Sequence, residues 1–229
     1  MKAIKDYQEP ASVADFVAEV GVDPATGLDR AAAMTRRDLY GANRVTPPVN
    51  CPSWVCCLLP CLLRTASMQA FNASLPREST VRRRITSIDG KPATRRMRMD
   101  AMSLVYGDVV ELAAGDVVGA DLRVVESSDD CVVDQSVLVG DDQDEDEEQG
   151  EQRSRKRVTA ASPSVDARQD PLVCGNILLM ATRVVQGSAV AVVVSTGDHT
   201  VWGEMVSQHA WPLPTSSRRR APEEQGLIV

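Results

Sequence analysis

The stretch Asp134–Glu148 holds the residues whose types and spacing are best suited to chemistry. It begins as a tight turn lined by apolar side chains and continues into polar residues that are mostly acids. A tight turn that ends in carboxylates, as this one does at Asp141, can be a catalytic loop. The same acids can also be the start of a disordered charged segment. The residues alone leave both interpretations open.

The acidic run has the spacing of a calcium loop only in part. Asp142, Asp144 and Asp146 alternate like the first ligands of a helix-loop-helix calcium site. The sixth position of such a loop needs glycine for its sharp turn, and here it is Glu147. We therefore expect weak, diffuse cation association at most, and no metal site.

Four of the six cysteines crowd into one short stretch, and they are Cys51, Cys56, Cys57 and Cys61. No Cys-x-x-Cys pair occurs, and His199 and His209 lie far away in the sequence, so a zinc site is not predicted. The chain opens without a signal peptide, which favours a reducing compartment over a disulfide framework.

These four cysteines lie in the most apolar stretch of the chain, and arginines follow it. A helix that spans a bilayer takes roughly 20 apolar residues, whereas Trp54–Leu63 is about half that length and contains Pro60. We predict that this stretch can lie on a membrane but does not cross one. Because stable anchoring needs two signals, the cysteines with the nearby arginines are lipid-anchor candidates through S-acylation. Alternatively, they are remnants of a membrane-approach segment that packs on the domain.

The elements that must hold these residues are short helices followed by a valine-rich β region. Helical spacing predicts helices over Ser12–Val20 and Asp29–Leu39, the second with Gly41 as a stop signal. Short Val, Ile and Leu runs between Gly, Asp and Ser turns predict six strands. These are Thr80–Ile85, Val109–Leu112, Asp121–Val125, Cys131–Val133, Ile177–Thr182 and Val184–Ser195. A chain of 229 residues with two Phe, three Tyr and three Trp should form one main domain with an aliphatic core.

Charge is arranged in blocks along the chain. The formal net charge is −7, and Asp141–Glu151 alone holds eight acids. The range 142–170 is acidic, then basic, then rich in Ser, Ala and Pro, and its shortage of apolar residues predicts a disordered insertion. A disordered tail is predicted over 207–229. The basic stretch Arg77–Arg98 lacks interleaved aromatic residues, so we expect a solvated strand surface and no nucleic-acid partner.

Four motif segments follow one another along the chain. They are Gly27-Leu-Asp-Arg30 with Asp38-Leu-Tyr-Gly-Ala-Asn-Arg-Val-Thr-Pro-Pro48, Phe71-Asn-Ala-Ser-Leu-Pro76, Gly107–Arg123 with its two Gly-Asp turns, and Thr196-Gly-Asp-His-Thr-Val-Trp-Gly203. Together they resemble the N-terminal part and actuator domain of P-type cation-transporting ATPases, closest to the sodium/potassium and calcium pump branch (type II). The family's turn reads Gly-Asp-x-x-Pro-Ala-Asp where this chain has Gly115–Asp121. Gly119 replaces the proline, which predicts a loosened turn.

The resemblance implies a mainly β fold: a distorted jelly-roll or β-barrel actuator domain with short N-terminal helices and one C-terminal helix. It also implies five divisions of the chain. These are a helical N-terminal segment over 1–48, a Cys/Leu-rich membrane-approach segment over 49–67, an actuator-like β domain over 68–141 and 171–206, the insertion over 142–170, and the tail over 207–229.

The turn that begins at Asp134 stands in the place of the Thr-Gly-Glu-Ser loop of that family. The glutamate of that loop orients the water that hydrolyses an aspartyl phosphate on another domain. Asp134, Ser136 and Leu138 match the family's lead-in Asp-x-Ser-x-Leu. The lead-in therefore indicates that the next residues form the loop itself.

The loop of this chain reads Val139-Gly140-Asp141-Asp142. It keeps the glycine that lets backbone approach a phosphoryl group, but Asp141 is one methylene shorter than glutamate and Val139 has no hydroxyl. Asp142 adds a negative charge opposite an anionic substrate. The resemblance thus implies Gly140 and Asp141, together with Val139 and Asp142, as the residues of a degenerate dephosphorylation loop.

The resemblance also implies what the intact enzyme needs. It implies ATP and Mg²⁺ for the intact enzyme. The sequence of this chain has no Asp-Lys-Thr-Gly phosphorylation motif, and we expect no cofactor in this chain. The expected function is the actuator portion of a cation pump, as a truncated or partial form that is inactive alone, so whether the chain is an enzyme stays open. The expected partner is the phosphorylation domain of a full-length pump, at the cytosolic face of a membrane and without a complete transmembrane helix in this chain. The alternative is a free-standing, non-enzymatic, membrane-associated regulator that binds a full-length pump.

Overall fold

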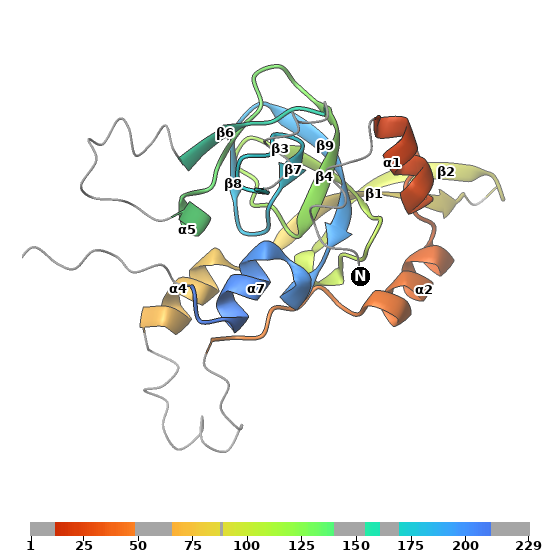
Figure 1. The fold of residues 1–229 in the computed structure, drawn as a ribbon. Helices are drawn as coiled ribbons and strands as arrows, with labels where there is room; N and C mark the ends of the chain where they lie inside the picture. Colours follow the sequence, from red (N-terminus) through yellow and green to blue (C-terminus); the bar gives the residue numbers. More distant parts are fainter. Residues whose placement is uncertain (1–11, 49–65, 88, 140–153, 161–169, 212–229) are drawn as a thin grey trace, which may run out of the picture.

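The fold is built from strands in two antiparallel sheets, with helices on their outer faces (Figure 1). The computed structural model describes residues 12–48, 66–87, 89–139, 154–160 and 170–211. The strands are β1 (Glu78–Thr86), β2 (Pro92–Asp100), β3 (Val109–Ala113), β4 (Asp121–Ser127), β5 (Val132–Asp134), β6 (Arg155–Arg157), β7 (Ile177–Leu178), β8 (Arg183–Gln186) and β9 (Ser188–Ser195). The helices are α1 (Val13–Val20), α2 (Arg30–Tyr40), α4 (Ala66–Ser74), α5 (Ser136–Val139) and α7 (Val201–Ser207).

The larger sheet has six strands in the order β2-β1-β3-β9-β4-β7. Its middle strands are Val-rich and buried on both faces, as the continuous apolar runs predict. The smaller sheet has the order β6-β5-β8. The mainly β prediction is therefore confirmed. In the part of the chain that the structure describes, the strands form two sheets and no closed barrel.

The range Val184–Ser195, expected as one run, divides between the two sheets at Gly187. β8 pairs with β5 in the smaller sheet, and β9 pairs with β3 and β4 in the larger one. Gly187 has φ +75°, and a Cβ at this position would lie 2.7 Å from the Cα of Cys131. Only glycine permits both the left-handed backbone and this close approach, so the chain crosses between the sheets here.

Strand β6 lies inside the range 142–170, which the sequence analysis assigned to a disordered insertion. Arg155–Arg157 pairs antiparallel with β5, with Val133 opposite Lys156. The side chains alternate, so that Arg155 and Arg157 are exposed while Lys156 is buried. The pairing escaped the sequence analysis because the inward residue is a lysine, whose long aliphatic stem packs like an apolar residue. The rest of that range up to Gln169, apart from residues 154–160, lies outside the described residues.

The two N-terminal helices cover one face of the larger sheet. Ser12 caps α1 by accepting the N–H of Asp15, and Asp29 caps α2 by accepting the N–H of Ala32. Their apolar faces pack on alternate residues of β3, β4 and β9 in a cluster that includes Phe16, Val109 and Val192. The opposite faces of those strands form the main core with the smaller sheet.

A third cluster packs α4 and α7 against the chain around Ile177–Ala181. The sequence analysis expected one C-terminal helix without giving its bounds, and it assigned no helix over Ala66–Ser74. Three aromatic rings form the centre of this cluster. Phe71 of α4 stacks on Trp202 of α7 at a centroid distance of 5.3 Å, and Trp211 meets Trp202 edge-on at 5.4 Å.

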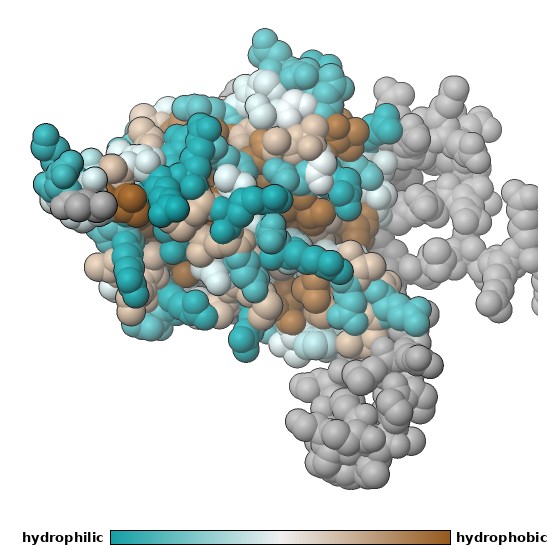
Figure 2. Space-filling view, turned by 180° about the vertical axis from the view of Figure 1, so that it is seen from behind, coloured by the Kyte–Doolittle hydropathy of each residue, from teal (hydrophilic) through white to brown (hydrophobic). Residues whose placement is uncertain are grey.

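The basic hairpin of β1 and β2 carries most of its arginines in ion pairs. Arg82 and Arg96 both contact Glu111, and Arg98 lies 3.4 Å from Glu78. The reverse side of the molecule shows hydrophilic side chains between smaller apolar patches (Figure 2). The hairpin is therefore a polar surface in which cations are largely matched by acids.

Candidate functional site

The candidate site begins where β5 ends, at the lead-in to the loop after Val139. Asp134 accepts the N–H of Ser136 at 2.8 Å and its hydroxyl at 3.2 Å. This side-chain turn starts the four-residue helix α5. Leu138 points into the aromatic cluster and is buried. The structure thus brings Asp134, Ser136 and Leu138 together in one turn, and Val139, the first predicted loop residue, is the last residue of α5.

The other predicted loop residues lie outside the described residues, and they are Gly140, Asp141 and Asp142. The lipid-anchor candidates Cys51, Cys56, Cys57 and Cys61 also lie outside them. Their assignments stay predictions from the sequence.

Gln135 fixes the base of the loop to its two neighbours. Its backbone N–H donates to the carbonyl of Ser154 at 2.7 Å, and its side-chain amide donates to the carbonyl of Leu172 at 3.0 Å. The residue is buried, and nothing in its type singled it out in the sequence. The chain segments on both sides of 140–153 are therefore joined directly.

Lys156 is the central residue of β6, two residues after Ser154, and its ammonium group is buried. Nζ donates to the carbonyl of Ile177 at 2.9 Å and to that of Pro171 at 3.2 Å. Burial lowers the pKa of the Lys156 ammonium to about 8, while nearby Cys174 and Asp121 act in the opposite direction. The lysine connects β6 to the segment that leads into β7.

Trp211 supports α5 from the side of α7. Its indole Nε1 donates to the carbonyl of Val137 at 2.9 Å, and its side chain is buried. The sequence analysis placed it in the disordered tail over 207–229, where residues 207–211 are described and the rest is not. A bulky aromatic residue in a chain with three Trp was the signal that could have marked it.

Asp121 joins β4 to α7 from inside the core. One carboxylate oxygen accepts the N–H of Met180 at 2.7 Å, and the other accepts that of Val201 at 2.8 Å. Burial raises the pKa of the Asp121 carboxyl to about 7, although these two donors oppose the shift. Asp108 and Asp116 accept backbone N–H groups three residues away, whereas the backbone N–H groups that Asp121 accepts come from residues remote in sequence.

The first and the last motif segments are in contact. The Asn43 amide donates to the carbonyls of Ala101 and Gly119 and accepts the N–H of Gly197 at 2.8 Å. Asp198 accepts both the N–H and the hydroxyl of Thr46. The turn that precedes α7 is therefore held to the segment that precedes residues 49–65.

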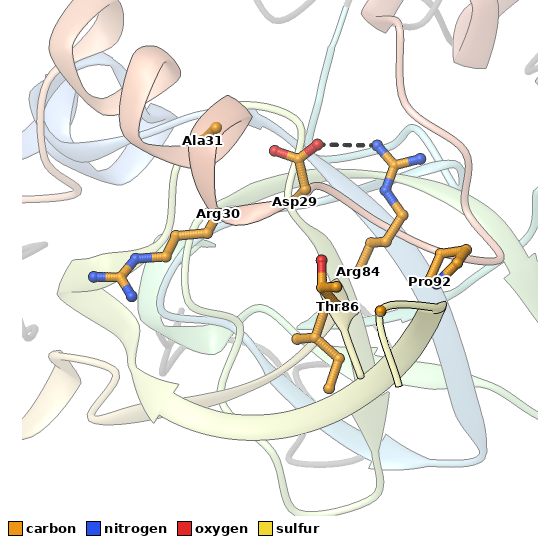
Figure 3. A pocket seen from close by; sticks show the side chains of 8 residues that line it. Asp29, Arg30, Ala31, Arg84, Thr86 and Pro92 are labelled. Carbon is orange, nitrogen blue, oxygen red and sulfur yellow. Dashed lines mark hydrogen bonds and ion pairs between the residues drawn. The ribbon is translucent and has the colours of Figure 1, made fainter. Parts of the chain in front are cut away.

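A separate groove of about 610 Å³ lies between the start of α2 and the β1–β2 hairpin (Figure 3). Asp29 and Arg84 face one another across it at 3.1 Å, and Arg30 points away from that pair. In Figure 1, α2 and the β1–β2 hairpin, whose residues line the groove, lie on the opposite side of the molecule from α5, so the groove is not part of the loop's support. Within the described ranges, no group of three or more His, Cys, Asp or Glu is arranged to hold a metal ion.

The sequence pattern of the P-type ATPase actuator domain matches residues 76–210, which is more than half of the chain. The chain belongs to the P-type ATPase actuator domain family. The matched region runs from just before β1 to beyond α7, so it includes both sheets, α5 and the Asp121 contacts. The expectation of a P-type ATPase actuator domain is confirmed.

The chain is also similar to curated P-type ATPases. It is 34% identical over 140 residues to the sodium/potassium-transporting ATPase subunit alpha-4 of Rattus norvegicus, which covers 61% of this chain and 11% of that protein. Identity is 35% over 141 residues with subunit alpha-3 of Homo sapiens and 34% over 140 residues with subunit alpha-2 of Gallus gallus, with the same coverage. The chain thus spans about a tenth of the length of these relatives.

A solved structure of a zinc-transporting PIB-type ATPase in the E2.Pi state is 18% identical, with a TM-score of 0.38, and the match covers 66% of this chain and 20% of that one. Among the helices that the structure describes, none combines the length and the apolar character needed to cross a bilayer.

Proposed function

We propose that this chain supplies the actuator domain of a P-type cation pump and carries there the loop that promotes hydrolysis of an aspartyl phosphate. The match over residues 76–210 is the observation that carries this proposal. The turn of Asp134, Ser136 and Leu138 supports it, because a rigid lead-in is what a catalytic loop needs.

The loop chemistry follows from the sequence Val139-Gly140-Asp141-Asp142. Asp141 orients the attacking water, and Gly140 lets the backbone approach the phosphoryl group. The shorter carboxylate sets the water back, and a displacement of about 1 Å costs on the order of 100-fold in rate. We therefore propose that this loop supports slow dephosphorylation.

The partner in this proposal is the phosphorylation domain of a pump. The phosphoacceptor aspartate, the ATP and the Mg²⁺ of the reaction all belong to that partner and to the nucleotide-binding domain. The sequence of this chain contains no Asp-Lys-Thr-Gly motif. We propose accordingly that the isolated chain does not hydrolyse ATP.

The third cluster supports a location at the cytosolic face of a membrane. Val45 lies just before residues 49–65 and Phe71 lies just after them, and both residues pack in the cluster with Trp202. The apolar Cys/Leu-rich stretch therefore begins and ends at one side of the domain. We propose that this side faces the membrane, where the stretch and the family's membrane helices would meet it.

A chimera tests the proposed function. Residues 68–211 replace the actuator domain of a sodium/potassium-transporting alpha subunit, and the decay of the phosphorylated intermediate is followed after labelling from ATP. We expect decay on the order of 100-fold slower than in the parent, and slower still with Asp141→Asn. Equal decay rates for the chimera and its Asp141→Asn variant would show that the loop has no catalytic part.

A further inference from the structure

Trp211 reaches α5 because the chain reverses after α7. His209 has φ +57°, a left-handed backbone that histidine adopts more readily than most residues. The N–H of Ala210 then donates to the carbonyl of Met205 at 2.9 Å, which closes the helix end. This turn directs the following residue, Trp211, back toward the third cluster.

Trp211 touches three elements at once. Its ring meets Trp202 of α7 at a centroid distance of 5.4 Å and Phe71 of α4 at 6.5 Å, both edge-on. Its Nε1 donates to the carbonyl of Val137 in α5. A four-residue helix leaves its last carbonyls without partners inside the helix, so this bond satisfies a group that α5 itself cannot.

We propose that Trp211 is a positioning residue that links α4 and α7 to α5, so that a displacement of either longer helix moves the start of the loop after Val139. The inference rests on the proposed function, because the position of the loop affects activity only if the loop must reach a phosphoryl group. The link is a single hydrogen bond. The indole N–H of Trp211 connects the aromatic cluster to Val137, two residues before α5 ends at Val139.

The cluster contains a matched control. Trp202 is also buried, but its Nε1 has no hydrogen-bond partner. Trp211→Phe and Trp202→Phe therefore both exchange an indole for a smaller ring, and only the first removes a hydrogen bond to α5. A difference between the two variants isolates the bond from the change in ring size.

Amide hydrogen exchange of the intact chain measures the link. The N–H groups of Leu138 and Val139 both donate to the carbonyl of Gln135 and report on opening of α5. We expect about tenfold faster exchange at these two amides in Trp211→Phe, which is the effect of losing one ordinary hydrogen bond. Trp202→Phe should leave them unchanged, and Val192 in the sheet should exchange at the same rate in all three proteins. Equal exchange at α5 in the two variants, or a uniform increase that includes Val192, overturns the proposal.

A second measurement needs no variant. If α5 and α7 form one body, their amides in the wild-type chain open together, with the same dependence of exchange on low denaturant concentration. Opening of α5 while α7 stays protected overturns the link even if Trp211→Phe does not fold.

The pump chimera separates this inference from the proposed function. With both correct, Trp211→Phe slows decay of the phosphorylated intermediate at least several-fold, leaves its formation unchanged, and differs in this from Trp202→Phe. A chimera in which Asp141→Asn has no effect rejects the proposed function, and the exchange result stands without it. Unchanged decay in Trp211→Phe, in a chimera that does respond to Asp141→Asn, overturns the coupling.

Discussion

The carboxylate of Asp121 on β4 accepts the backbone N–H of Val201 at 2.8 Å, and this bond joins the six-stranded sheet to the first residue of α7. Its other oxygen accepts the N–H of Met180 at 2.7 Å. One buried side chain thus fixes the position of the helix that carries Trp202 of the aromatic cluster.

Asp121→Asn should be less stable than the wild type by about 1–3 kcal/mol at pH 5, because the amide nitrogen cannot accept an N–H. The deficit should shrink as the pH rises to 8. Burial raises the folded-state pKa of Asp121 from 3.8 to about 7, so the wild type loses stability as the pH rises toward and through that value, whereas asparagine does not titrate. Urea unfolding at both pH values measures the deficit. Asp116→Asn, at a half-buried turn where the side chain accepts a single N–H, is the control. A stability deficit of Asp121→Asn that widens as the pH rises would contradict the expectation.

Arg83→Ala should destabilise the protein by about 3–5 kcal/mol, because it leaves a buried carboxylate without its partner. Arg83 binds Asp108 through two contacts of 2.7 and 3.0 Å, and the Asp108 side chain is 0% exposed. Arg98→Ala removes the pair with Glu78, which is 3.4 Å long and more than half exposed on both sides, and should cost less than about 1 kcal/mol. Thermal and urea unfolding of both variants would show similar losses if burial of the ion pair were unimportant.

Gly119→Ala should cost about 1–3 kcal/mol through overpacking. A Cβ at this position would lie 2.8 Å from Cδ1 of Leu104 and nearer still to Oγ of Ser79. Ser79→Ala should restore part of the loss, because it removes an oxygen that has no hydrogen-bond partner. Unfolding free energies of the two single variants and the double variant form the test, and simple additivity would show that the contact with Ser79 does not limit this position.

Val139→Thr, Asp141→Glu and Asp142→Ser together should raise the dephosphorylation rate of the pump chimera. The longer carboxylate brings the water closer, and the loss of one negative charge favours a phosphoryl group; we expect a gain of about 10-fold to 100-fold. Rapid-quench measurement of phosphoenzyme decay gives the rate. The same three changes with Gly140→Ala added should remove the gain, and an unchanged rate in the triple variant would show that the loop lies elsewhere.

Replacement of Cys51, Cys56, Cys57 and Cys61 by serine should release the chain from membranes in cells and abolish its thioester-linked acylation. Cell fractionation and acyl exchange measure the two effects. Cys131 and Cys174 remain in this variant as internal controls, because both residues are fully buried. Acylation that persists in the quadruple variant would contradict the anchor assignment.

Local patterns were enough to predict the parts of the fold that local forces decide. The caps at Ser12 and Asp29, the valine-rich central strands and the turn from Asp134 to Leu138 all follow from neighbouring residues. β6 was missed because its buried residue is Lys156. Burial of this ammonium group requires the carbonyls of Pro171 and Ile177, which lie far away in the sequence.

The supports of the site were harder to predict, because they join residues far apart in sequence. Gln135 bonds Leu172, and Trp211 bonds Val137, across separations of 37 and 74 residues. No spacing rule reports such pairs, and only the folded chain brings them together. The motif segments indicated the family through their order, but not that Asn43 and Gly197 would touch.

The bond from the N–H of Gln135 to the carbonyl of Ser154 has a consequence for engineering. It holds the two ends of the segment 140–153 close together. A change in the number of residues between these ends should therefore leave the rest of the domain largely unaffected. Doubling the length of such a closed loop costs only about 0.6 kcal/mol in chain entropy. Residues 143–153, which follow the proposed catalytic loop, are therefore a site where a fluorescent reporter can be inserted without cutting into either sheet.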